Sequence, residues 1–197
     1  LASGTKCGFT GFVFTPTAAT DAVGMFTTNS GRIRNMTFGM DVTQSATSTS
    51  TGVNKGTLAA LNSGTIANLT STSAMDYTYS GTGSAKVFRV GGVVGENSGT
   101  ITGTTASGTV TATNYVGAGV ATATGTQYVG GLAGYISGTG TITSSSTSSN
   151  VYAVMKNTHT STSTFYAGGM AGLNVSTAAS SLADVSTTGS VSMDFAG

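Results

Sequence analysis

Side chains that could act as an acid, a base or a nucleophile are few and lie far apart in the sequence. His159 is the only histidine, in the stretch KNTHTSTSTFY, and Cys7 is the only cysteine. Acid–base and nucleophilic catalysis need such groups within hydrogen-bonding reach of one another. A Ser-His-Asp triad assembled in space stays open, but no serine lies in the G-x-S-x-G turn of hydrolases. We therefore expect His159 to lie in a surface loop and the chain not to be an enzyme.

The acidic residues could serve a glycosidase or a calcium site only if several of them met. A glycosidase needs two carboxyl groups across the scissile bond, and Ca²⁺ takes about six to eight oxygen ligands. Asp41 and Asp76 stand next to Val42 and Met75, so we expect both carboxylates to point outward. Two carboxylates are too few ligands for a cation site. The sequence therefore predicts solvated carboxylates, with no catalytic residue, metal or cofactor. The six carboxylates are Asp21, Asp41, Asp76, Glu96, Asp184 and Asp194.

Other sequence motifs of ligand sites do not occur either. One Cys and one His cannot supply the usual zinc clusters, and the sequence contains neither a Walker A motif nor G-x-G-x-x-G. Cys7 has no partner for an internal disulfide, so we expect it to be buried or unpaired, while a disulfide to another chain stays open. Asn35, Asn68 and Asn174 begin N-x-S/T sequences, which we interpret as chance matches in so Thr-rich a chain.

The composition indicates an ordered, β-rich chain that is polar without being charged. Only 7% of the 197 residues are charged, the net charge is +1, and Ser and Thr together number 65. Thr and Val favour strands, and nucleic-acid binding needs clustered Lys and Arg that this chain lacks. No apolar run approaches the ~18 residues of a transmembrane helix, and no signal peptide opens the chain. We expect Ser/Thr tracts such as TSTST and TSSSTSSN to form loose loops.

A glycine-rich phrase recurs five times and organises the whole chain. VGMFTTNSGRI, GTLAALNSGTI, VGGVVGENSGTI, VGGLAGYISGTGTI and AGGMAGLNV begin near residues 23, 56, 91, 130 and 168. Three apolar positions recur in each unit, and the third always lies nine residues after the second. The first set is Met25, Leu58, Val93, Leu132 and Met170; the second is Ile33, Ile66, Ile101, Ile142 and Leu182; the third is Val42, Met75, Val110, Val151 and Val191.

Such a repeat predicts an all-β solenoid in which stacked units bury one apolar ladder per recurring position. We expect about five coils of 33–39 residues, with length variation confined to Ser/Thr-rich loops. Residues 1–22 are expected to form an N-terminal cap or lead-in strands. The repeats are expected to fill residues 23–197, with units near 23–55, 56–90, 91–129, 130–167 and 168–197.

Corner turns are predicted where an Asn-Ser-Gly sequence follows the glycine-rich strand. Asn bonds its own backbone in turns, and Gly adopts conformations that side chains disfavour. Stacked Asn residues forming an amide ladder and independent turns both stay open. The predicted corner residues are Asn29, Gly31, Asn62, Gly64, Asn97 and Gly99.

These units resemble the GLUG repeat in VGGVVGENSGTI, VGGLAGYISGTGTI and GTLAALNSGTI. The stretch GFTGFVFTPTAATDAVGMFTTNSGRIRNMTFGMDVT resembles the segment that introduces such arrays. The resemblance implies a right-handed parallel β-helix, found in secreted or surface-attached bacterial proteins such as adhesins, with no shared catalytic residue. Units one and five depart from the pattern, and no anchoring tail follows Gly197, so we expect a segment of a longer chain.

We therefore expect a structural or adhesive solenoid segment at the bacterial cell surface or outside the cell. Its partners would be copies of itself, stacked end to end or laterally into a filament, or surface glycans and proteins. A carbohydrate-binding or carbohydrate-cleaving β-helix is the alternative, and an ice-binding Thr-x-Thr surface is a further one. Rings that could stack on sugars are those of Tyr115, Tyr128, Tyr135, Tyr152, Phe165 and Tyr166.

Overall fold

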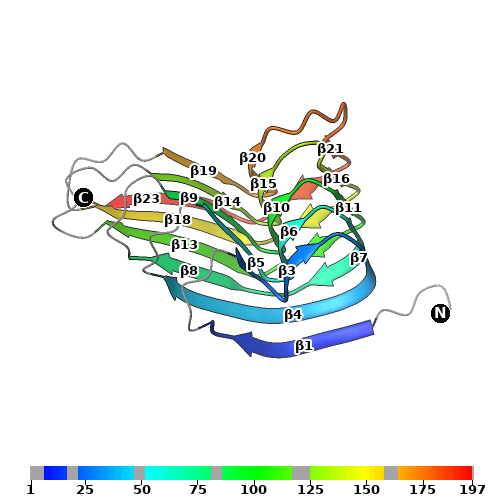
Figure 1. Ribbon diagram of the computed structural model, residues 1–197, viewed down its shortest axis with the longest axis horizontal. Helices are drawn as coiled ribbons and strands as arrows, with labels where there is room; N and C mark the ends of the chain where they lie inside the picture. The colour runs from blue at the N-terminus through cyan, green and yellow to red at the C-terminus, as the bar shows by residue number, and fades with distance from the viewer. Residues whose placement is uncertain are drawn as a thin grey trace.

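The protein is all-β and its strands pair in parallel (Figure 1). The computed structural model describes residues 7–16, 22–46, 52–80, 86–116, 125–157 and 164–196. Within these ranges every helix or strand element is a strand, and the strands form three sheets. His159 and Asp21 lie outside the described residues.

When each unit is counted from its sheet B strand, a few residues before the boundary predicted from sequence, the two five-stranded sheets B and C each take one strand from every unit, in chain order. Sheet B contains β2 (Ala22–Val23), β5 (Gly52–Gly56), β9 (Lys86–Gly91), β14 (Gly125–Gly130) and β19 (Thr164–Gly168). Sheet C contains β3 (Phe26–Asn29), β6 (Ala59–Asn62), β10 (Val94–Asn97), β15 (Ala133–Ile136) and β20 (Ala171–Asn174).

Sheet A has thirteen strands and takes in the nine-residue arc of each unit. In the first unit the arc is one long strand, β4, which pairs with β7 over its first half and with β8 over its second. The strands of sheet A are β1 (Cys7–Phe14), β4 (Arg32–Ala46), β7 (Thr65–Ser71), β8 (Met75–Tyr79), β11 (Thr100–Thr102), β12 (Thr105–Ala106), β13 (Thr109–Val116), β16 (Thr141–Thr143), β17 (Ser146–Thr147), β18 (Asn150–Asn157), β21 (Leu182–Ala183), β22 (Ser186–Thr187) and β23 (Val191–Ala196).

Each unit runs through sheet B, then sheet C, then sheet A, and the next unit repeats the path beside it. In Figure 1 the last strands of four units, β8, β13, β18 and β23, lie side by side in that order. Hydrogen-bonded side chains in neighbouring units are between 33 and 42 residues apart. Before the first unit, β1 pairs with β4 from Cys7↔Met36 to Phe14↔Val42.

The recurring apolar residues are aligned between units and most of them are buried. Ile66, Ile101 and Ile142 are direct register partners and have no exposed surface. Met75, Val110 and Val151 form a second row in the same way. The first recurring position lies in the bend between sheets B and C, where the amide of each of the first four residues bonds a carbonyl of the next unit, as from Val93 N to Leu132 O at 3.0 Å.

Three of the predicted core residues are exposed, contrary to the prediction. Met25 is 38% exposed, Leu182 39% and Val191 43%. They keep the alignment of their rows, since Leu182 pairs with Ile142 and Val191 with Val151. Their exposure follows from their place in the first and last units, where no further described unit covers one side.

Part of the interior is polar, because hydroxyl groups there bond the backbone. Thr104, Ser145 and Thr147 are buried on the arc of units three and four, so the prediction that the TSSSTSSN tract forms a loose loop is wrong. The Ser145 hydroxyl accepts a hydrogen bond from Thr104 N at 3.1 Å and donates to Thr143 O at 2.7 Å. A buried hydroxyl with such partners avoids most of the cost of leaving water, so the units close around an interior with few large apolar side chains.

Lys55 is the one charged residue among the buried side chains of the described chain. It stands in an inward row of sheet B between Val23 and Val90. Its ammonium lies 5.3 Å from the centroid of the Tyr77 ring, close enough for a cation–π interaction. The composition gave no sign that one of the seven basic residues would face inward.

Replacing Ile101 with Asp tests the alignment of the core rows. We expect the free energy of unfolding to fall by at least about 3 kcal/mol, because the variant buries an unpaired charge between Ile66 and Ile142. Thr100→Asp is the matched control on the exposed side of the same strand and should change stability by less than about 0.5 kcal/mol. Chemical unfolding followed by circular dichroism gives both values, and equal losses would show that this strand does not face a core.

Candidate binding site

The bend between sheets B and C brings outward side chains of two sheets together. Sheet B ends at Gly91 in unit three, two residues turn, and sheet C begins at Val94. The backbones of neighbouring units approach closely here, because a Cβ added at Gly134 would lie 2.5 Å from Val90 N. One added at Gly95 would lie 2.5 Å from Lys55 N. The glycines of the repeated phrase are therefore needed for close approach of backbones at this bend.

Two rows of outward residues border this bend, which we call the B–C bend. On sheet B, register pairing aligns Asn54, Arg89, Tyr128 and Tyr166. On sheet C it aligns Leu61, Glu96, Tyr135 and Leu173. Tyr166 is exposed and the others are half-buried. The rows mix planar polar groups with aromatic rings along the direction in which the units stack.

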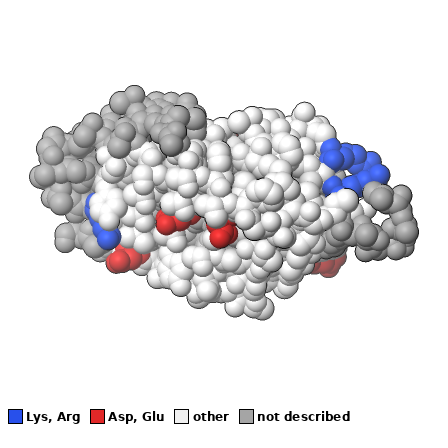
Figure 2. Space-filling model, turned by 90° about the horizontal axis from the view of Figure 1, so that it is seen from below, with Lys and Arg blue, Asp and Glu red and all other residues white. Residues whose placement is uncertain are grey.

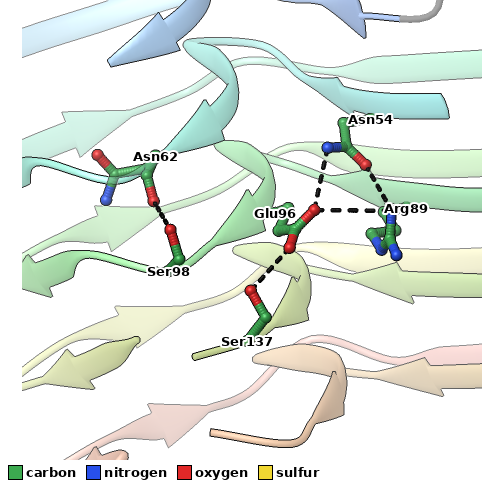
Figure 3. A network of polar contacts seen from close by, with 6 residues as sticks. All are labelled: Asn54, Asn62, Arg89, Glu96, Ser98 and Ser137. Carbon is green, nitrogen blue, oxygen red and sulfur yellow. Dashed lines mark hydrogen bonds and ion pairs between the residues drawn. The ribbon is translucent and has the colours of Figure 1, made fainter. Parts of the chain in front are cut away.

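Glu96 is the centre of a polar network at the B–C bend (Figure 3). Its Oε2 accepts a hydrogen bond from Asn54 Nδ2 at 3.1 Å and lies 3.6 Å from a guanidinium nitrogen of Arg89. Its Oε1 accepts a hydrogen bond from the Ser137 hydroxyl at 2.7 Å. Arg89 also donates to Asn54 Oδ1 at 3.2 Å. Four side chains from three units thereby hold one another in place, with the two charged side chains 24% and 19% exposed.

Three tyrosine rings continue the B–C bend beyond this network. The Tyr128 ring centroid lies 5.3 Å from that of Tyr166, nearly parallel at 18°, and 4.9 Å from that of Tyr135, tilted by 47°. The Arg89 guanidinium lies 4.7 Å from the Tyr135 centroid, within cation–π range. Burial raises the pKa of Tyr128, and the neighbouring Tyr135 and Tyr166 phenols add to this, so the phenol stays a neutral hydrogen-bond donor at neutral pH.

The chemistry of the B–C bend suits binding rather than bond cleavage. Its only carboxylate, Glu96, is engaged by three donors, and Ser137 donates to it instead of being activated by a base. No three His, Cys, Asp or Glu side chains of the described residues are grouped to hold a metal ion. What the surface offers a ligand is aromatic faces beside fixed hydrogen-bonding groups.

The predicted corner asparagines form a ladder of amide hydrogen bonds. Asn29 Nδ2 donates to Asn62 Oδ1, and Asn62 Nδ2 donates to Asn97 Oδ1, each at 2.7 Å. All three side chains are buried. Of the two alternatives left open by the sequence, the structure shows the ladder, although Asn29 also caps its own turn by accepting from Gly31 N at 3.2 Å.

The amide ladder stops at the fourth unit because an isoleucine takes the next place. Ile136 is the register partner of Asn97 and is fully buried. Asn97 Nδ2 donates instead to Thr141 O at 3.1 Å and Gly99 O at 3.3 Å. The buried amide of Asn97 therefore keeps its partners where the ladder ends. The remaining predicted corner glycines, Gly64 and Gly99, each pack against the corner backbone of the preceding unit.

A second corner, which the sequence analysis missed, lies two residues after each Ile position. The backbone there has positive φ in all five units, between 47° and 57°. Asn, Ser and Asp tolerate this region better than β-branched residues do, and one of them or Gly occupies the position in every unit. The residues are Asn35, Asn68, Gly103, Ser144 and Asp184.

Asn35 and Asn68, interpreted from sequence as chance N-x-S/T matches, are therefore corner residues. Asn68 Nδ2 donates to Asn35 Oδ1 at 3.1 Å on the surface.

The other residues singled out from sequence lie apart from the B–C bend. Cys7 is a free thiol, which agrees with the prediction that it is buried or unpaired, and it is exposed rather than buried. Asp41 and Asp76 are exposed, and Asp41 Oδ1 accepts a hydrogen bond from Ala74 N at 2.9 Å. Tyr115 and Tyr152 are exposed on sheet A, where Lys156 donates to the Tyr115 hydroxyl at 3.3 Å.

The outward Thr positions do not form a uniform array. Equivalent places on sheet A read Thr65 and Ala67 in the second unit, but Thr100 and Thr102 in the third. The fourth unit repeats the pair as Thr141 and Thr143. A Thr-x-Thr sequence therefore lines up here in two consecutive units, whereas the first unit presents Arg32 and Arg34.

Comparison with known proteins identifies the repeated phrase. Residues 87–111 match the family model of the GLUG motif. The matched GLUG motif begins in β9, passes the B–C bend and the Asn97 corner, and ends just after Val110. No curated protein and no solved structure matches the chain. None of the described residues forms a helix that could span a membrane.

Replacing Asn62 with Ala tests the amide ladder. The variant leaves Asn97 Oδ1 without its donor and Asn29 Nδ2 without its closest acceptor, so we expect the free energy of unfolding to fall by about 1–3 kcal/mol. Ser63→Ala, at an exposed neighbour in the same turn, removes only the 3.3 Å hydrogen bond from the Ser63 hydroxyl to Asn29 O and should cost less than about 1 kcal/mol. Thermal unfolding of both variants measures the difference. An Asn62→Ala protein as stable as Ser63→Ala would mean that the corners are independent turns.

Proposed function

We propose that this chain is a right-handed β-solenoid of about five coils and a non-catalytic, structural and adhesive segment of a secreted bacterial cell-surface protein. The observation that carries the proposal is the strand order, because each sheet takes its strands from successive units with equivalent residues in register. A rod built this way lengthens by about 4.8 Å for each added unit. Right-handedness is supported by the strong preference of parallel crossover connections for that hand.

The bacterial surface setting is supported by the GLUG motif and by the composition. The GLUG resemblance implies secreted and surface-attached proteins, adhesins among them. A chain with 7% charged residues and 65 Ser and Thr presents hydroxyl-rich, nearly uncharged faces to other surfaces. Figure 2 shows one such face, on which most of the surface is uncharged, basic residues lie near the two ends of the long axis, and a few acidic residues lie between them. We propose no catalytic role because Glu96, the carboxylate in the polar network of the B–C bend, is paired with Arg89 and is therefore not free to act as an acid or a base.

Self-assembly by end-to-end stacking is part of the proposal. In the last unit, β23 exposes the apolar side chains of Val191, Met193 and Phe195. These residues continue the rows of their β18 register partners, Val151, Ala153 and Met155. At the other end, Phe12 and Val13 of β1 are exposed. Strands at both ends have one described neighbour, so their unpaired backbone groups and apolar side chains can add another copy. The same geometry would also join this segment to further solenoid units of a longer chain.

A charge placed on the last strand tests the assembly. We expect the purified chain to form extended oligomers in sedimentation and electron microscopy, and Phe195→Lys to shift them to monomers by setting repelling, solvated charges at each junction. Thr43→Lys, exposed on the side of the rod, should leave assembly unchanged. Circular dichroism must show both variants folded. A parent chain that stays monomeric at high concentration would refute end-to-end assembly.

A further inference from the structure

We propose that the B–C bend binds an uncharged oligosaccharide, with Tyr128, Tyr135 and Tyr166 as stacking platforms and Glu96, Arg89 and Asn54 as hydrogen-bonding groups. The proposal deepens the adhesive part of the proposed function, on which it rests, by naming a site and a ligand class. Its readout is ligand binding, which is separate from the assembly measured above.

The aromatic part of the site is suited to the apolar faces of sugar rings. Tyr128 and Tyr166 lie in the same outward row of sheet B and stack on each other, so this pair offers a sugar the outer face of the exposed Tyr166 ring and the ring edges. Tyr135 faces Tyr128 from sheet C, so the rings border the bend from two sides. Stacked aromatic side chains give contact area at low conformational cost, and a phenol adds a hydrogen bond at its edge. The rings are already ordered by one another and by Arg89 before any ligand arrives.

The polar part of the site is suited to hydroxyl groups. Asn54, Glu96 and Ser137 are half-buried. Asn54 and Ser137 donate hydrogen bonds of 3.1 and 2.7 Å to the Glu96 carboxylate, which fixes all three side chains. Amide and carboxylate groups keep additional lone pairs and N–H groups after these bonds, so they can accept from and donate to vicinal hydroxyls. A binding site needs few such groups, provided that they are placed rigidly.

The charges at the site favour a neutral ligand over an acidic one. Glu96 and Arg89 compensate each other at 3.6 Å, and the raised pKa of Tyr128 keeps its phenol neutral. An acidic sugar would have to take Arg89 from Glu96 and leave that carboxylate without its cation. A neutral sugar leaves the ion pair intact and uses only the remaining hydrogen-bonding capacity.

The spacing of the row suits a linear chain of sugars that runs along the stacking direction. Asn54, Arg89, Tyr128 and Tyr166 stand on four neighbouring strands of sheet B, about 4.8 Å apart from strand to strand. A pyranose unit is about as long as this spacing, so successive sugars can meet successive units. This predicts that affinity rises with oligosaccharide length up to about three or four sugars.

Binding can be measured with neutral hexasaccharides of glucose, mannose and N-acetylglucosamine, and with a hexamer of galacturonic acid as the charged comparison. The chain has seven Tyr and no Trp, so near-ultraviolet difference spectra report ligand contact with tyrosine directly. Isothermal titration then gives affinities for the parent chain and three variants. Tyr166→Ala removes a stacking ring, and Tyr152→Ala is the matched control, because both side chains are 39% exposed but Tyr152 lies on sheet A.

We expect at least one neutral hexamer to bind, Tyr166→Ala to weaken it about tenfold, and Tyr152→Ala to leave it unchanged. Glu96→Gln should also weaken binding, since it replaces one carboxylate oxygen with an NH2 group and removes the charge that holds Arg89. Circular dichroism keeps loss of fold separate from loss of site. The proposal is overturned if no neutral hexamer binds at millimolar concentration, if Tyr152→Ala weakens binding as much as Tyr166→Ala, or if only the acidic hexamer binds.

Discussion

In-register parallel pairing between successive units is the constraint on which the rest of this structure depends. When a strand lies against its equivalent in the next unit, every side chain meets the side chain at the same place in the repeat. Ile101 therefore contacts Ile66 and Ile142, Asn62 contacts Asn29 and Asn97, and Tyr128 stands against Tyr166. Like groups must tolerate one another, so apolar rows face inward, amides bond in ladders, and charges are rare.

This constraint explains how so polar a chain buries a core. Only some inward rows need large apolar residues, because others are closed by buried hydroxyls and amides that bond the backbone or one another. At the B–C bend the close approach is made by glycines, and it leaves room on the outside for the ordered surface of Arg89, Glu96 and Tyr135. The feature that allows stacking thus also creates the proposed glycan site.

Positions at which the same residue type recurs can be recognised in the sequence. Positions that share only a backbone conformation or a place in space cannot. Ile66, Ile101 and Ile142 could be placed in one row because the residue and its spacing both recur, whereas Leu182 is exposed because no further described unit lies beside it. The left-handed corner at Asn68, Gly103 and Ser144 shares a backbone conformation rather than a side chain, so it gives no motif. The B–C bend could not be predicted because Asn54, Arg89, Glu96 and Tyr135 belong to three different units. They come together only where sheets B and C meet in the folded chain.

The most direct test of the account is a cross-link that depends on the register of the arc. In a Cys7→Ser background, Thr102→Cys/Thr143→Cys pairs two outward positions that are register partners and whose hydroxyls lie 3.1 Å apart. Their Cα atoms should be about 4.8 Å apart, within the range of a disulfide. Mass spectrometry of non-reduced peptides after mild oxidation should show this disulfide forming much faster than in Thr100→Cys/Thr143→Cys, which is shifted by two residues. Equal rates for the two pairs, or faster oxidation of the shifted pair, would contradict the stacking of units in register.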